Sequence, residues 1–215
     1  MRSTQWFEGT SAVFGWVASL AYLNLLWVCG TLCGVIVLGL APSTAALFAV
    51  LRRMVRKEAA DLPLTKLFLS FYRQDFWQAN LVFWPLFLVG VVLYADVQIL
   101  AFMTGWLSTV LSFLTLIIGV FYVITCVFCV PVYVHFDMKW WDYYKSALFL
   151  GLLKPLHFLA SVVSVVVVYY FMLQIRPLLL FFGASAGAFI ITSVTQPVLA
   201  RLSPLGHWNG GGSKE

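Results

Sequence analysis

The sequence predicts an all-α protein, a polytopic bundle of about five transmembrane helices that forms one domain over residues 1–215. Two observations predict it: 62% of the residues are hydrophobic and only 10% are charged, whereas soluble domains are roughly 25% charged. The charges also divide the chain into apolar runs, and a helix needs roughly 20 apolar residues to cross a bilayer. The 13 Lys and Arg are scattered at the ends of these runs, so we expect no nucleic-acid partner.

The first apolar run extends from Glu8 to Arg52 without an Asp, Glu, Lys or Arg. It is too long for one helix, and Gly39 and Pro42 predict a break. We expect a first span near 12–40. A second, short helix over 43–57 is expected to lie at the inner surface or re-enter the membrane, with Ser43 or Thr44 as its cap.

Four further runs predict spans near 76–95, 106–133, 155–175 and 177–200. With this topology only Arg2 and Arg176 lie outside, and the other eleven of the 13 Lys and Arg lie in the cytoplasm. Because cytoplasmic loops are enriched in Lys and Arg, the bias favours one long helix near 106–133 over two. It also predicts that the amino terminus lies outside and the carboxyl terminus in the cytoplasm.

Two segments have the spacing of amphipathic helices that lie in the membrane interface. In the first, Leu64, Leu67, Phe68 and Phe71 alternate with Lys66, Ser70, Arg73 and Gln74. In the second, Trp140, Trp141, Tyr144 and Leu148 alternate with Lys139, Asp142 and Lys145. We expect both helices to orient the neighbouring spans, and a docking role is the alternative.

Chemistry-bearing residues are sparse. None of the predicted spans has a charged residue in its middle, and Asn24 is the conspicuous polar residue within a span. Cys29 with Cys33 and Cys126 with Cys129 are interpreted as small apolar residues. His135 and His157 are interpreted as polar residues at helix ends. We therefore expect no catalytic, cofactor-binding or metal site, and no enzyme.

Small residues four apart allow close approach of helix backbones in membranes. Two such pairs occur, Gly30 with Gly34 and Gly183 with Gly187. Packing within the chain is the simplest use of each pair, and contact with another membrane protein is the alternative.

Several motifs together resemble the YesL-like family of bacterial membrane proteins. They are Asn24-Leu25-Leu26-Trp27, then Gly39-Leu40-Ala41-Pro42-Ser43-Thr44-Ala45-Ala46-Leu47, then Arg52, and finally Phe76-Trp77-Gln78-Ala79-Asn80. The later half matches in pattern only. Members of this family tend to be encoded beside ABC importers for oligosaccharides, so the resemblance implies a link to carbohydrate uptake.

The leading hypothesis is a non-enzymatic accessory subunit of a carbohydrate ABC importer that binds the permease subunits within the bilayer. The alternative is an independent transporter or channel for sugars or other small solutes; a membrane enzyme is the least favoured class. The candidate residues for a partner or packing interface are Asn24, Trp27, Gly30, Gly34, Thr44, Arg52, Arg53, Trp77, Asn80, Gly183 and Gly187.

Overall fold

The computed structural model describes residues 3–56, 58 and 63–202. Within these residues the chain forms eight helices and no strand, so the predicted all-α class is confirmed. The helices are α1 (Ser3–Cys33), α2 (Leu40–Val55), α3 (Leu64–Gln74), α4 (Phe76–Phe102), α5 (Trp106–His135), α6 (Trp140–Leu153), α7 (Pro155–Gln174) and α8 (Arg176–Leu202). Arg2, Lys57 and Lys214, which entered the predicted charge bias, lie outside the described residues.

Five of these helices are long and apolar enough to cross a membrane: α1 over Gly15–Cys33, together with α4, α5, α7 and α8. They correspond one to one to the five predicted spans, and the chain is a multi-pass membrane protein. Residues 106–135 form a single long helix, α5, as the charge bias predicted.

Two predicted boundaries are wrong. The first span ends at Cys33 rather than at residue 40, because Val35 and Ile36 adopt φ angles of 57° and 61°, which no right-handed helix contains. The second span does not end before Asp96, since α4 continues through this residue to Phe102. The chain then turns at Gly105, whose φ of 106° suits glycine alone.

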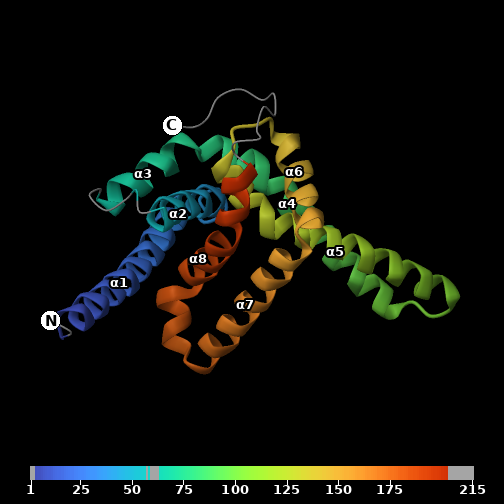
Figure 1. Ribbon diagram of the computed structural model, residues 1–215. Coiled ribbons are helices and arrows are strands. Elements are labelled where there is room, and N and C mark those ends of the chain that lie inside the picture. Colours follow the sequence, from blue (N-terminus) through green and yellow to red (C-terminus); the bar gives the residue numbers. More distant parts are fainter. Residues whose placement is uncertain (1–2, 57, 59–62, 203–215) are drawn as a thin grey trace.

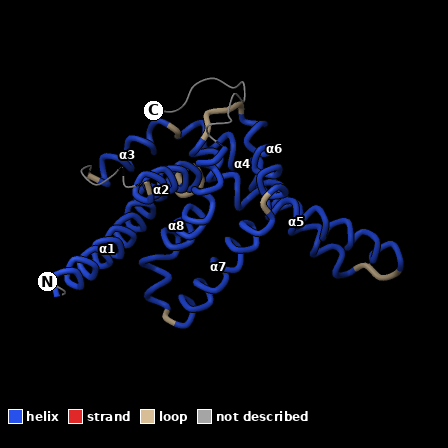
Figure 2. Tube along the Cα trace, viewed as in Figure 1, coloured by secondary structure: helices blue, strands red, loops and turns tan. Residues whose placement is uncertain are grey.

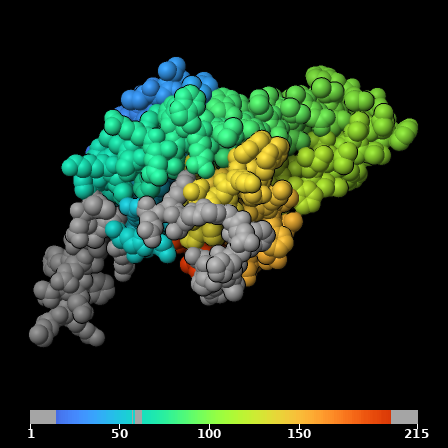
Figure 3. Space-filling view, turned by 90° about the horizontal axis from the view of Figure 1, so that it is seen from above, coloured from blue at the N-terminus to red at the C-terminus, as the bar shows by residue number. Residues whose placement is uncertain are grey.

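The arrangement resembles three legs that diverge from a common end (Figures 1 and 2). The legs are α1, the α4–α5 hairpin and the α7–α8 hairpin. We call the end from which they diverge the shared end; α2, α3 and α6 lie there, and α3 and α6 are at its surface in Figure 3. The positions of α3 and α6 agree with their predicted roles as helices that orient the spans.

The α2 helix is the central element of this end. It packs against α1, α3, α4, α5 and α8, and its side chains from Ala41 to Leu51 are almost all buried. Four of the buried residues are alanines, which let neighbouring helices approach closely. Since α2 is not among the apolar helices long enough to span, the short, non-spanning helix that the sequence predicted is confirmed.

The legs bury little of their surface against the rest of the chain. Large apolar side chains near the tip of the α4–α5 hairpin are highly exposed, with Phe102 at 88% and Trp106 at 79%. Such exposure would be a liability in water, but lipid is a suitable solvent for it.

Candidate functional site

Asn24 connects α1 to the N-terminal third of α8. Its Nδ2 donates a hydrogen bond to the carbonyl oxygen of Leu180 at 2.8 Å, and its Oδ1 accepts one from the backbone N–H of Ala184 at 3.0 Å. In a regular helix these two backbone groups bond to each other, because residue i pairs with residue i−4. The Asn24 amide therefore bonds to both members of one backbone pair of α8, and Asn24, 2% exposed, is satisfied within the chain.

The glycine pair on α8, Gly183 and Gly187, lies beside the residues to which Asn24 bonds. The surroundings of the two glycines differ. Tyr169 of α7 donates its hydroxyl to the carbonyl of Gly183. A Cβ on Gly187 would lie 3.1 Å from the Tyr169 hydroxyl, whereas a Cβ on Gly183 would meet only Leu179 of its own helix, at 3.9 Å. Gly187 thus provides close packing between α7 and α8, and Gly183 has room for a methyl group.

The pair of Gly30, on α1, and Gly34, just after its end, is enclosed by the chain itself. A Cβ on Gly30 would lie 2.7 Å from Ser43 Oγ, and one on Gly34 would collide with the backbone of Gly39. The hydroxyl of Tyr72, from α3, donates to the carbonyl of Gly30 at 2.9 Å. This pair is therefore used for packing among α1, α2 and α3.

Trp27, Thr44 and Asn80 hold the connection between α1 and α2. The indole N–H of Trp27 donates to Thr44 Oγ1 at 3.1 Å, and Asn80 Nδ2 donates to the carbonyl of Leu38 at 3.0 Å. Thr44 lies inside α2 and donates to the carbonyl of Leu40. The predicted cap is wrong: α2 begins earlier, Gly39 occupies the cap position, and no side chain caps the helix.

Arg52 bonds to the end of α5. Its Nη1 donates to the carbonyl oxygen of Val134 at 2.6 Å. The last four carbonyls of a helix lack partners within it, and a cation near this end is also favoured by the helix dipole. Burial lowers the pKa of Arg52 from its ordinary value, and nearby Arg56 adds to this, but an arginine remains charged.

Arg53 and Trp77 lie nearer the surface. The Arg53 guanidinium is 4.9 Å from the ring centroid of Phe71 in α3, a cation–π contact. Trp77 is 78% exposed in the first turn of α4 and packs edge-on against Phe76. Of the predicted interface residues whose side chains are described, Trp77 is therefore the one most accessible to lipid or to a partner.

The side chains of α6 that the chain buries most lie outside the apolar face that the sequence predicted for the membrane interface. Tyr143, Ala147, Leu150 and Gly151 are buried, while Trp141 is 58% exposed. Tyr143 accepts a hydrogen bond from the backbone N–H of Met138 at 3.1 Å, and burial raises its pKa to about 12. Tyrosine can be buried when its hydroxyl finds a partner, and spacing alone did not reveal that partner.

Asp96 is the residue that the sequence interpretation wrongly placed just beyond the end of the second span. It lies within α4 and accepts a hydrogen bond from the hydroxyl of Thr115 in α5. The informative signal was that Asp96 has uncharged apolar sequence on both sides. A carboxyl group in a transmembrane helix is a candidate functional residue.

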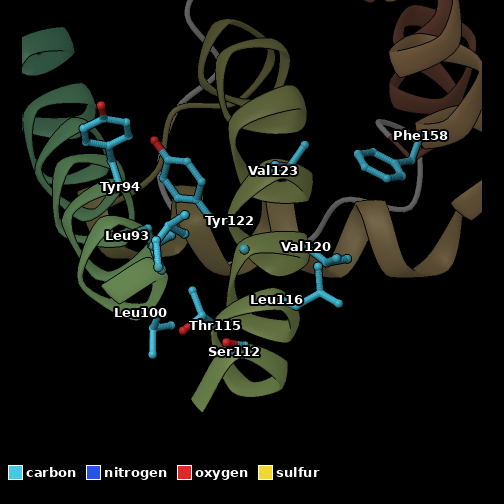
Figure 4. A pocket seen from close by; sticks show the side chains of 13 residues that line it. Leu93, Tyr94, Leu100, Ser112, Thr115, Leu116, Val120, Tyr122, Val123 and Phe158 are labelled. Atoms are coloured by element: carbon cyan, nitrogen blue, oxygen red, sulfur yellow. The ribbon is translucent and has the colours of Figure 1, made fainter. Parts of the chain in front are cut away.

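Beside this pair lies a groove of 810 Å³ along the α4–α5 hairpin (Figure 4). Its walls are mostly apolar, and Thr115 belongs to both the groove and the pair. Gly119 contributes an open patch, since a Cβ there would meet nothing within 4 Å. The residues lining the groove are Leu93, Tyr94, Val97, Leu100, Ala101, Ser112, Thr115, Leu116, Gly119, Val120, Tyr122, Val123 and Phe158.

The cysteines and histidines do not converge on a metal site in the part of the chain that the structure describes. No group of three or more His, Cys, Asp or Glu side chains there could hold a metal ion. All four cysteines are free thiols.

Comparison with known proteins places these features in one family. The family described as "Protein of unknown function, DUF624" matches residues 20–97, a segment that contains Asn24, Arg52, Asn80 and Asp96. No solved structure matches the chain.

Three similar proteins come from Bacillus subtilis (strain 168), and all are uncharacterized. YteU is 32% identical over 192 residues, 89% of this chain and 85% of YteU. YesV is 32% identical over 78% of this chain and 80% of its own length. YesL is 30% identical over 84% of each chain. The chain therefore belongs to the YesL-like family of bacterial membrane proteins.

Proposed function

We propose that the protein is a non-enzymatic accessory subunit of a carbohydrate ABC importer and that it binds the permease within the bilayer. The choice of partner follows from the family resemblance. The structural support is the way in which the chain uses its polar groups.

Four polar side chains of the interior donate hydrogen bonds to the backbone of another segment. Asn24 joins α1 to α8, Arg52 joins α2 to α5, Tyr72 joins α3 to α1, and Asn80 joins α4 to the segment after α1. These groups hold the helices in place and are not left to bind a solute. This use of the polar interior is the observation that carries the proposal.

The groove on the α4–α5 hairpin also favours a role in protein association. A sugar presents many hydroxyl groups, and a site that recognises it needs several placed polar partners. The polar groups on this groove are the side chains of Ser112 and Thr115 and two tyrosine hydroxyls. Its apolar walls suit a helix surface better than a sugar.

In this proposal the membrane is the bacterial cytoplasmic membrane. The shared end faces the cytoplasm with the carboxyl terminus, and the tips of the legs face outward with the amino terminus. The charge bias carries this orientation, because α2, α3 and α6 and the residues that adjoin them hold nine of the 13 Lys and Arg. ATP hydrolysis would belong to a partner subunit.

Recovery of partners from native membranes tests the proposal. The tagged full-length chain is purified in a mild detergent and the co-purifying proteins are identified by mass spectrometry. We expect both permease subunits of a carbohydrate ABC importer, in amounts comparable to the tagged chain. Recovery of the chain without a permease would contradict the proposal.

A second candidate is an independent transporter, and Asp96 is the observation that favours it. A carboxyl group within a span can carry protons during transport. Uptake of labelled sugar into proteoliposomes that contain only this chain would support that function. Loss of uptake in Asp96→Asn would assign the coupling of sugar uptake to proton transport to this residue.

A further inference from the structure

The α4–α5 hairpin carries one charged side chain in a long apolar stretch. Asp96 is the only Asp, Glu, Lys or Arg between Phe76 and Phe136. Its partner Thr115 lies on the adjacent helix. At 1.5 Å per residue, both residues lie about 30 Å along their helices from the shared end.

The tip beyond this pair is also uncharged. Residues 97–114 contain no Asp, Glu, Lys or Arg. With 27 and 30 residues, α4 and α5 are about 40 and 45 Å long, more than the roughly 30 Å of the hydrocarbon core. Tilting the hairpin so that its apolar helices lie in lipid and its turn reaches the outer surface places the carboxyl of Asp96 below the outer boundary of the core.

The chain satisfies this carboxyl only in part. An ionised carboxylate offers about four acceptor positions, and the hydroxyl of Thr115 provides one hydrogen bond. Among the side chains that the structure describes, no cation forms an ion pair with Asp96; the ion pairs there join Arg56 to Glu58 and Lys145 to Asp142. A charge in lipid is costly unless it is paired, so a cationic donor is the chemistry that this position lacks.

The groove extends from Phe158 near the shared end to Leu100 and Ser112 near the tip, and Thr115, the partner of Asp96, lines it (Figure 4). We propose that this face of the α4–α5 hairpin is a docking surface for a transmembrane helix of a partner that presents a lysine or arginine to Asp96. The apolar walls receive the side chains of that helix, and the open patch at Gly119 allows close approach. The identity of the partner as the permease rests on the proposed function.

A second copy of this chain is the competing occupant. Arg176 lies at the tip of the α7–α8 hairpin, about 30 Å along α7 from the shared end. A dimer could therefore bring Arg176 of one copy to Asp96 of the other. The experiment separates the two occupants.

Synthetic transmembrane peptides test the surface without knowledge of the permease. Three peptides of leucine and alanine differ at one position in the outer half of the bilayer, which is Lys, Leu or Glu. Each carries a dye and is mixed with the full-length chain, fused to a fluorescent protein, in vesicles of phosphatidylcholine and phosphatidylglycerol. Energy transfer measures binding. We expect the Lys peptide to bind about tenfold more tightly than the Leu peptide, and the Glu peptide to bind least.

Two variants test whether Asp96 causes the preference for the Lys peptide. Asp96→Asn should bind the Lys and Leu peptides equally, and Thr109→Val, which removes an exposed hydroxyl of the same hairpin, should keep the preference of the wild type. Equal binding of the Lys and Leu peptides to the wild type overturns the proposal, and so does a preference that persists in Asp96→Asn. If the wild type forms dimers that are lost in both Asp96→Asn and Arg176→Gln, the occupant of the surface is a second copy of the chain. That result would also overturn the proposal.

Permease recovery from native membranes distinguishes this inference from the proposed function. If wild type and Asp96→Asn recover equal amounts of permease, the docking surface is wrong while the accessory role stands. If the wild type recovers no permease but prefers the Lys peptide, the accessory role is wrong and the cation-selective surface stands.

Discussion

The side-chain oxygen of Asn24 accepts a hydrogen bond of 3.0 Å from the backbone N–H of Ala184, which lies 160 positions further along the chain. The same amide donates to the carbonyl of Leu180, so it bonds to both members of one backbone pair of α8. In lipid, unsatisfied backbone groups cost several kcal/mol. The docking of α1 and the local structure of α8 are therefore coupled through one side chain.

Asn24→Leu should destabilise the fold by about 1–2 kcal/mol, because it keeps the apolar volume but removes the interhelical hydrogen bonds. Unfolding in mixed micelles with increasing sodium dodecyl sulfate measures the loss. Thr31→Val is the matched control, since Thr31 donates only to the carbonyl of Trp27 in its own helix. An effect of Thr31→Val as large as that of Asn24→Leu would contradict the coupling.

Arg52→Gln should cost about 1.5–3 kcal/mol, the range for a hydrogen bond to a charged group, because it leaves the Val134 carbonyl without its cation. Arg53→Gln should cost less, about 0.5–1 kcal/mol, since it removes an exposed cation–π contact with Phe71. The same unfolding assay compares the two variants. If Arg53→Gln were the more destabilising, Arg52 would not be the arginine that anchors α5.

The two glycines on α8 should respond differently to alanine. Gly187→Ala places a Cβ 3.1 Å from the Tyr169 hydroxyl, and we expect a loss of about 1 kcal/mol from overpacking. Gly183→Ala meets only Leu179, and it should be neutral or stabilise by up to about 1 kcal/mol through helix propensity. Thermal unfolding in detergent measures both; similar effects at the two positions would refute this assignment.

The fold was predictable to the extent that charge and length determine it. Long uncharged runs can satisfy their backbone groups in a membrane only as helices. Most ends of the five spans were therefore predicted to within a few residues. The break after α1 was predicted from Gly39 and Pro42, but the chain breaks earlier, at Val35 and Ile36. Positive φ is rare for β-branched residues, and no local pattern indicates it.

Side-chain partners across the bundle were less predictable. Asn24 was identified because it is polar within a span, yet its partner on α8 depends on tertiary packing. Asp96 was treated as the end of a span because charges were used as boundaries, and that rule cannot identify a functional charge within a helix. The burial of Tyr143 in α6 was not predicted, because its hydrogen-bond partner at Met138 is brought to it only in the folded chain.

The orientation of the chain can be tested with single cysteines in a variant whose four native cysteines have been replaced. Thr104→Cys, in the turn between α4 and α5, and Arg176→Cys should react with a membrane-impermeant maleimide on intact cells. Lys66→Cys and Lys145→Cys should react only after permeabilisation, because the Lys and Arg of the shared end favour the cytoplasmic side. Thr104 is labelled in place of Asp96, which follows the predicted end of the second span, because Asp96 lies within α4 and is bonded to Thr115.

Two controls make the labelling decisive. A permeant maleimide should label all four variants, which shows that each thiol is accessible in principle. Gly119→Cys, in the apolar groove, should resist the impermeant reagent from either side, since thiols react as thiolates and lipid suppresses ionisation. Labelling of Lys145→Cys on intact cells would reverse the orientation. It would also move Asp96 to the cytoplasmic half of the bilayer, so a partner's basic residue would have to be sought in its inner half.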